Sequence, residues 1–252
     1  IMKMNILIIS SSNRIVFQIA KDLLKEGHHV ALHYNSDNSK IKDLFSMYKQ
    51  RSFMIQADLL KENGAFDLYN ETYRVLGFPD TIINNAGIAV SAPLNQENKI
   101  WINNFDKTIS VNLKSPSILS KLFIEKKRKE KIIKKFRIIN IASRAAFRGE
   151  VEDFISYACS KGGLVSLTKT IARSFGKKDN VFAFSIAPGF VNTEMAKSFI
   201  KENGEDFVKK GIQLNRLTEP KDISPVVSLI CTGKMDHSTG STIDINAGSY
   251  LR

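Results

Sequence analysis

The amino-acid sequence predicts an α/β fold in which one doubly wound parallel sheet, of about seven strands, carries helices on both faces. Short apolar runs alternate with longer segments of helical periodicity along all 252 residues, as expected when helices connect parallel strands. No low-complexity tract, internal repeat or Pro/Gly/Ser-rich linker interrupts the alternation. We therefore expect residues 1–252 to form a single domain.

Each predicted strand is a short apolar run, and several are apolar on both faces, which is typical of parallel strands covered on each side. The runs are Asn5–Ser10, His29–Tyr34, Ser52–Gln56, Thr81–Asn84, Phe136–Ala142, Val181–Ala187 and Ser241–Asn246. Between the first two, apolar residues from Ile15 to Leu24 recur at helical spacing. Gly27 follows, where a left-handed helix end is expected.

Composition excludes several classes of protein. Hydrophobic residues make up 43% and charged residues 25% of the chain, which is ordinary for a globular protein and unlike a disordered, collagenous or disulfide-stapled chain. The two cysteines and four histidines show no metal-ligand spacing, so we expect no metal site. The N-terminal apolar run is too short to span a membrane. We expect a cytoplasmic protein with no membrane partner.

The turn after the first predicted strand reads Ser10-Ser11-Ser12-Asn13-Arg14-Ile15 and contains no glycine. In a doubly wound sheet this turn usually holds a phosphate at a helix N-terminus. The candidate cofactor contacts here are Ser10, Ser12, Asn13, Arg14 and Ile15. The alternative is that the hydroxyls and Asn13 only cap the helix.

The end of the second predicted strand bears on the choice of dinucleotide. An NAD site usually places an acid there to hold the ribose hydroxyl, whereas a 2′-phosphate favours Arg, Lys or small donors. Tyr34 stands at that position, followed by Asn35 and Ser36, although Asp37 is close. The pattern favours NADP(H) over NAD(H), with Asn35 and Ser36 as contacts.

Four polar residues form the candidate catalytic set. Asn112 lies in a helical segment, Ser143 follows the fifth strand, and Tyr157 and Lys161 are four residues apart on one helix face. A neighbouring ammonium lowers the pKa of a tyrosine from about 10, so that Tyr157 can exchange a proton with a substrate oxygen. Ser143 would hydrogen-bond that oxygen. Alone, each residue is as well explained by a cap or a solvated helix position.

Together with the Asn84-Asn85-Ala86-Gly87 segment and the Pro188-Gly189 turn, this set resembles the short-chain dehydrogenase/reductase family along essentially the whole chain. The resemblance implies a Rossmann-like fold and a carbonyl-reducing oxidoreductase. It also implies that Asn112 positions a water and Lys161 holds the nicotinamide ribose. The remaining cofactor contacts would be Asp58, Leu59, Asn85, Ala86, Gly87, Tyr157, Pro188, Gly189, Val191 and Thr193, with a substrate lid over about residues 190–215.

The branch of the family is less defined. Ala187–Met195, Leu214–Ile223 and Gly240–Gly248 resemble 3-oxoacyl-[acyl-carrier-protein] reductases, whereas Leu32-His33-Tyr34 and Gln56–Leu59 resemble pteridine reductases. The substrate is therefore an acyl-carrier-linked or a small-molecule carbonyl, with an alcohol dehydrogenase as a further alternative. The family's TGxxxGxG turn is replaced by Ile9, Ser10, Arg14 and Val16. This loss leaves open a non-catalytic member with weakened cofactor binding. Relatives are commonly homo-oligomers, so the resemblance implies a dimer or tetramer.

The net charge is 37 − 25 = +12, and five of these charges lie in Glu125–Lys135, which has seven basic and two acidic residues. We interpret this Lys-rich segment as a solvated helix end and loop. The alternative is a docking patch for an acidic carrier protein. No recognition motif or interleaved aromatic pattern accompanies the charges, so no nucleic-acid partner is expected. Cys159, between Tyr157 and Lys161, is interpreted as a small packing residue.

Overall fold

A computed structural model describes residues 3–9, 14–192, 204 and 211–252 of the chain. It contains one sheet of seven strands, all parallel, in the order β3-β2-β1-β4-β5-β6-β7. The strands are β1 (Asn5–Ile9), β2 (His29–Tyr34), β3 (Ser52–Gln56), β4 (Thr81–Asn84), β5 (Phe136–Ile141), β6 (Val181–Pro188) and β7 (Thr242–Ile245). The predicted doubly wound α/β fold is confirmed.

The strand order reverses between β1 and β4. The chain runs outward from β1 to β3, returns to pair β4 with β1, and then runs outward again to β7. Neighbouring crossovers therefore leave the sheet on opposite faces at this point, and open α/β sheets bind their ligands in a crevice outside the carboxyl ends of the strands at such a point. The fold alone places a ligand site there.

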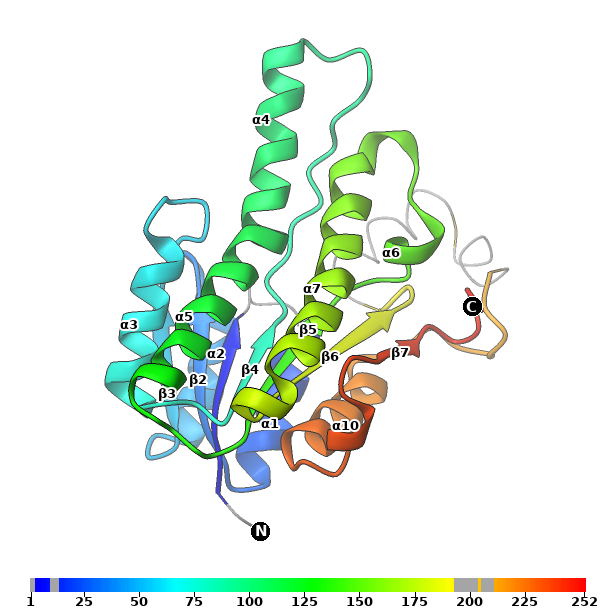
Figure 1. Cartoon of the computed structure of the whole chain (residues 1–252). Helices are drawn as coiled ribbons and strands as arrows, with labels where there is room; N and C mark the ends of the chain where they lie inside the picture. Colours follow the sequence, from blue (N-terminus) through cyan, green and yellow to red (C-terminus); the bar gives the residue numbers. More distant parts are fainter. Residues whose placement is uncertain (1–2, 10–13, 193–203, 205–210) are drawn as a thin grey trace.

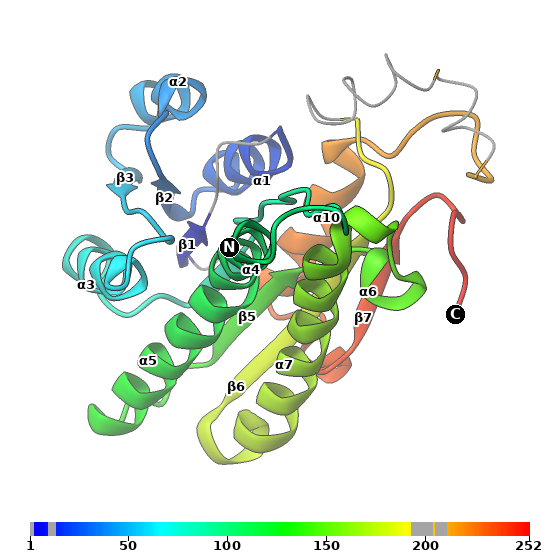
Figure 2. The ribbon, with the colours of Figure 1, turned by 90° about the horizontal axis from the view of Figure 1, so that it is seen from above.

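Helices cover both faces of the sheet, as Figures 1 and 2 show. One buried cluster joins the sheet to α1 (Arg14–Lys25), α2 (Ser39–Met47) and α10 (Pro220–Cys231). A second joins the opposite face to α3 (Gly64–Leu76), α5 (Ser115–Lys129) and α7 (Ile155–Asp179). The other helical elements are α4 (Asn98–Ile109), η1 (Ser110–Lys114), α6 (Ala145–Arg148), η2 (Glu152–Phe154) and η3 (Asp236–Ser238). Within the described ranges, no helix is long and apolar enough to cross a membrane.

The predicted strands agree closely with the observed ones, because runs such as Ile138-Ile139 are fully buried between two helical layers. Three bounds match to the residue, in β2, β3 and β4. The fifth strand ends one residue earlier than predicted, the sixth one later, and the seventh is two residues shorter. Gly27 has φ +95°, the left-handed conformation expected after α1.

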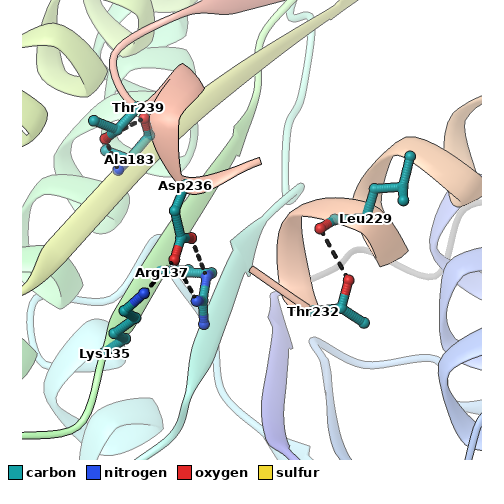
Figure 3. A network of polar contacts seen from close by, with 7 residues as sticks. All are labelled: Lys135, Arg137, Ala183, Leu229, Thr232, Asp236 and Thr239. Atoms are coloured by element: carbon teal, nitrogen blue, oxygen red, sulfur yellow. Dashed lines mark hydrogen bonds and ion pairs between the residues drawn. The ribbon is translucent and has the colours of Figure 1, made fainter. Parts of the chain in front are cut away.

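The Lys-rich segment is the end of α5 and the loop before β5, and most of it is exposed, as interpreted; Lys127 is the exception. The Lys127 side chain is buried and donates to the carbonyls of Ile132 and Lys134. Four other cations form ion pairs: Lys126–Glu130, Arg128–Asp179, Lys134–Asp80 and Lys135–Asp236. Figure 3 shows the pair of Lys135 with Asp236, and Asp236 also accepts two hydrogen bonds from Arg137.

The position of this segment weakens its interpretation as a docking patch. It spans the end of α5 and the loop before β5, at the end of the sheet near the N-terminus in Figure 1. The crevice lies at the opposite, carboxyl end of the strands. A carrier protein docked on the Lys-rich segment would therefore approach the wrong edge of the sheet.

Candidate active site

The four predicted catalytic residues come from three segments that meet at the carboxyl ends of the strands. Ser143 lies two residues beyond the end of β5, Tyr157 and Lys161 occupy the first turns of α7, and Asn112 lies at the centre of η1. The Lys161 Nζ is 5.6 Å from the centroid of the Tyr157 ring. The Ser143 hydroxyl is in hydrogen-bonding contact with the Tyr157 hydroxyl.

Asn112 is held by a local break in helical geometry. Residues Ser110–Lys114 form a single π-helical turn between α4 and α5, a feature often found at functional sites. The Asn112 side chain is fully buried; its Oδ1 accepts from Ile88 N at 2.8 Å and its Nδ2 donates to Ile88 O at 2.9 Å. A further bond from Nδ2 to Ser160 Oγ, at 3.0 Å, joins this turn to α7. The amide thus fastens three segments around the site.

Lys161 is only 4% exposed, and its Nζ donates to Ile141 O at 2.9 Å. Burial lowers the pKa of this amine to about 8, because little water remains to solvate the ammonium. A pKa of about 8 still leaves most of the population protonated at neutral pH. The site therefore contains a buried cation in contact with the ring of Tyr157.

The expectation that the pKa of Tyr157 is lowered is wrong for this structure. Burial raises the pKa of its phenol, and the hydrogen bond from Ser143 opposes this shift. The cause is desolvation of the phenolate, which here outweighs the nearby donors. Ser143 Oγ accepts a bond from Ala145 N at 3.1 Å, so its own proton is left to donate.

The segment after β4 packs directly against these groups. The main-chain N–H groups of Asn85 and Ala86 both donate to Ile9 O, at 2.9 and 2.7 Å. A Cβ on Gly87 would lie 3.3 Å from Lys161 Nζ and 3.6 Å from Asn112 Oδ1. Glycine thus lets this segment lie against the predicted catalytic residues. The Nδ2 of Asn85 is buried without a hydrogen-bond partner in the described structure, as expected of a donor that serves a ligand.

The first turn can be described only in part. Ser10, Ser12 and Asn13 lie outside the described residues, whereas Arg14 begins α1 with an exposed side chain. The side chains of Ile15 and Val16 are buried in the core beneath α1. Ile15 can therefore offer a cofactor only main-chain groups. Val16, in the place of a family glycine, is accommodated by the packing of helix on sheet.

The other predicted cofactor contacts lie along the same edge. Asn35 and Ser36 are exposed just beyond β2, while the Asp37 carboxylate accepts from Ser39 N at 2.8 Å at the start of α2. Asp58 and Leu59 follow β3, and Leu59 lines a small cavity with Ser110 and Lys114 from η1.

Beyond β6, Gly189 packs against the chain after β7, and Val191 pairs with the segment before α10. A Cβ on Gly189 would come within 2.7 Å of Asn246 Cα, so the chain needs glycine here. Val191 is buried and forms a bridge with Thr218. Thr193 and most of the predicted lid, residues 193–203 and 205–210, lie outside the described residues.

Two groups at the site escaped the sequence analysis. Ser160 donates to Tyr157 O at 2.7 Å and accepts from Asn112; its position between Tyr157 and Lys161 was the only available signal. Arg144, immediately after Ser143, is half-buried. Cys159 is exposed rather than packed, which corrects its interpretation as a packing residue, because it faces away from the side of α7 that carries Tyr157 and Lys161.

The site lies at the carboxyl ends of a parallel sheet, where such sheets bind their ligands. It combines Ser143, Tyr157 and Lys161 with Asn112, which is held by hydrogen bonds. These features define the class of protein as an oxidoreductase that uses a nicotinamide dinucleotide. A family model described as "Enoyl-(Acyl carrier protein) reductase" matches residues 9–249. The chain belongs to the short-chain dehydrogenase/reductase family.

Similar proteins include the 3-oxoacyl-[acyl-carrier-protein] reductase FabG of Staphylococcus epidermidis, 28% identical over 255 residues that cover 99% of this chain and 100% of the relative. The FabG protein of Aquifex aeolicus is 26% identical, covering 97% and 96%. A solved structure of 4-hydroxyisoleucine dehydrogenase complexed with NADH has a TM-score of 0.86 and 28% identity, covering 97% of this chain and 98% of its own.

Proposed function

We propose that the protein reduces a carbonyl to an alcohol with NADP(H), and that Asn112, Ser143, Tyr157 and Lys161 carry the reaction. The observation that supports this most strongly is that Tyr157 interacts with both Ser143 and Lys161 at the carboxyl ends of the strands. A binding protein has no need of a buried lysine beside a half-buried tyrosine, because burying the ammonium costs free energy.

The residues present fit a nicotinamide dinucleotide. The buried Asn85 Nδ2 has a donor to offer, and Gly87 and Gly189 lie beyond the carboxyl ends of β4 and β6, where such a cofactor binds. When bound, the dinucleotide supplies or accepts the hydride. Its contacts would be the residues of the first turn together with Asn35, Ser36, Asp58, Leu59, Ala86, Pro188, Val191 and Thr193.

The protein side of the reaction is the movement of one proton. The Tyr157 hydroxyl gives its proton to the developing alkoxide, while the Ser143 hydroxyl donates a hydrogen bond to the same oxygen. The buried Lys161 ammonium stabilises the tyrosinate that remains. Burial shifts the pKa of Tyr157 and of Lys161 toward their neutral forms. Opposite charges at this distance attract, so the Lys161 ammonium and the tyrosinate would stabilise each other against the cost of burial.

The preference for NADP(H) over NAD(H) rests on the end of β2. No acid follows Tyr34 directly, and the nearest one, Asp37, is engaged by the main chain of Ser39. Asn35, Ser36 and the exposed Arg14 are suited to a 2′-phosphate. The NADH in the similar 4-hydroxyisoleucine dehydrogenase makes NAD(H) the alternative.

The substrate is a carbonyl carried on an acyl carrier protein or a small molecule. The FabG relatives favour a 3-oxoacyl thioester. A pteridine reductase, an alcohol dehydrogenase and a non-catalytic member are the alternatives. The free thiols of Cys159 and Cys231 are consistent with a reducing, cytoplasmic location.

We also propose a homo-oligomer, either a dimer or a tetramer. Helix α4 extends well beyond the sheet in Figure 1. Thr108 is the one fully buried residue among its twelve, while Ile100 and Ile102 are about half exposed. Light scattering of the purified protein should show twice or four times the 28.3 kDa chain mass.

Calorimetric titration with NADPH and NADH tests the function. We expect both dinucleotides to bind, and NADPH to bind more tightly. Oxidation of the preferred dinucleotide is then measured with a panel of 3-oxoacyl thioesters, pterins and simple ketones. A 2-enoyl thioester, which has no ketone, is the negative arm. Absence of binding by either dinucleotide would leave the non-catalytic alternative.

A further inference from the structure

Arg144 has the features of a ligand-binding arginine. It follows Ser143 directly, and its main-chain N–H donates to Pro188 O at 3.1 Å, which ties it between the ends of β5 and β6. Its side chain is half-buried, and burial lowers the pKa of its guanidinium. Throughout the described residues this guanidinium makes no hydrogen bond, ion pair or ring contact.

Arg137 shows how this protein satisfies a buried guanidinium. It lies at the start of β5, is 7% exposed, and makes two bonds to Asp236, at 2.8 and 2.9 Å (Figure 3). Arg144 lies at the other end of the same strand without such a carboxylate. A guanidinium withdrawn from water and left unpaired costs free energy. A bound anion would remove that cost.

The nearby charges do not satisfy Arg144. Arg148 lowers the pKa of the Arg144 guanidinium and Glu150 raises it, so both lie within electrostatic reach. Glu150 is held instead by Arg148 Nη2, at 3.1 and 3.0 Å from its two carboxylate oxygens. The group of three keeps one net positive charge. Glu150 also raises the pKa of Tyr157, so its carboxylate lies within electrostatic reach of both Arg144 and the Tyr157 hydroxyl.

We propose that Arg144 binds an anionic group, a carboxylate or a phosphate, that the substrate carries a few bonds from its reacting carbonyl. This rests on the proposed reductase function and narrows it. The 3-oxoacyl thioester of the FabG relatives has no charge near its ketone. Arg144 therefore favours the other proposed substrate class, the small-molecule carbonyl, in the form of a free oxo acid or a keto phosphate. The planar guanidinium offers two parallel N–H donors to such a group.

Substrate pairs that differ in charge test the proposal. Acetoacetate and acetoacetamide have the same heavy-atom skeleton, and dihydroxyacetone phosphate with dihydroxyacetone forms the phosphate pair. We expect wild type to prefer the charged member of one pair by about tenfold to a hundredfold in kcat/KM, the range that a charge-assisted hydrogen bond provides. Arg144→Gln should abolish this preference, mainly through KM, and leave the neutral member unchanged. Arg144→Lys should retain part of it.

Arg173→Gln is the matched control, because it removes an exposed charge from α7 and should keep the preference. Equal use of both members by wild type, or an equal loss for both in Arg144→Gln, would overturn the role of Arg144 and leave the reductase function standing. Absence of dinucleotide binding would instead defeat the reductase function. Calorimetric titration of acetoacetate against acetoacetamide, with and without NADP⁺, then decides the proposal independently of turnover: selective binding that Arg144→Gln removes supports it, and no selectivity contradicts it.

Discussion

The buried amine of Lys161 predicts a characteristic dependence of stability on pH. In the folded protein its pKa is about 8, against an ordinary value of 10.5. The unfolded chain therefore holds the proton more tightly than the folded one. Keeping Lys161 protonated inside the protein costs about 3 kcal/mol, at about 1.4 kcal/mol for each unit of pKa difference.

The sign follows from proton binding. Below pH 8 both states are protonated and the whole cost is present. Between pH 8 and 10.5 the unfolded state binds more protons, so the contribution of Lys161 to the free energy of unfolding rises with pH. Above 10.5 neither state is charged and the cost has gone. The steepest slope is about 1.4 kcal/mol per pH unit.

Urea unfolding of wild type and Lys161→Met, without dinucleotide, isolates this contribution. The variant loses the bond to Ile141 O but no longer titrates. We expect the stability of wild type minus that of the variant to rise by about 2–3 kcal/mol from pH 7 to pH 10. Lys169→Met, which removes an exposed amine from the same helix, is the control and should give a flat difference. A flat difference for Lys161→Met would refute the buried-ammonium interpretation.

Two of the three further predictions concern the frame of the site, and the third concerns His28, a buried histidine just before β2. Gly189→Ala places a Cβ 2.7 Å from the facing main chain and should lower the free energy of unfolding by about 1–3 kcal/mol. Gly162→Ala is the control, because its Cβ would have its nearest contact at 3.7 Å, and it should leave the free energy of unfolding unchanged. Equal effects of the two variants in urea unfolding would contradict the close approach at Gly189. Asn112→Ala loses three side-chain bonds and should cost about 2–4 kcal/mol; a change below 1 kcal/mol in urea melts would show that the π-turn stands without it. Burial lowers the pKa of His28, so the unfolded state binds its proton first as the pH falls through about 6.5; wild type should lose stability there relative to His28→Gln, and parallel pH profiles would exclude this role.

The sheet could be predicted from the sequence because its strands are buried on both faces and their apolar runs have clear ends. The run from His29 to Tyr34 is an example, and it matches β2 to the residue. The meeting of Asn112, Ser143, Tyr157 and Lys161 could also be predicted, because the fold brings the elements that carry them together at the carboxyl ends of the strands.

The rest depends on contacts between elements that are distant in sequence. The π-turn at Asn112 requires α7 to lie close, where a Cβ on Gly163 would come within 2.5 Å of Leu113. The opposite pKa shifts of Tyr157 and Lys161 arise from burial, which periodicity does not measure. The burial of Lys127 could not be predicted either, because the sequence does not distinguish it from the exposed lysines around it. Arg144 is unpaired among the described residues because the Glu150 carboxylate accepts its hydrogen bonds from Arg148 instead.

The central claim is that Tyr157 donates the proton in a dinucleotide-dependent reduction. Its most direct test is the rate of NADPH oxidation by wild type and Tyr157→Phe with a reducible ketone, with NADPH binding measured alongside. We expect the variant still to bind NADPH and to lose about a hundredfold or more in kcat. A variant that turns over at the rate of wild type would contradict this role of Tyr157.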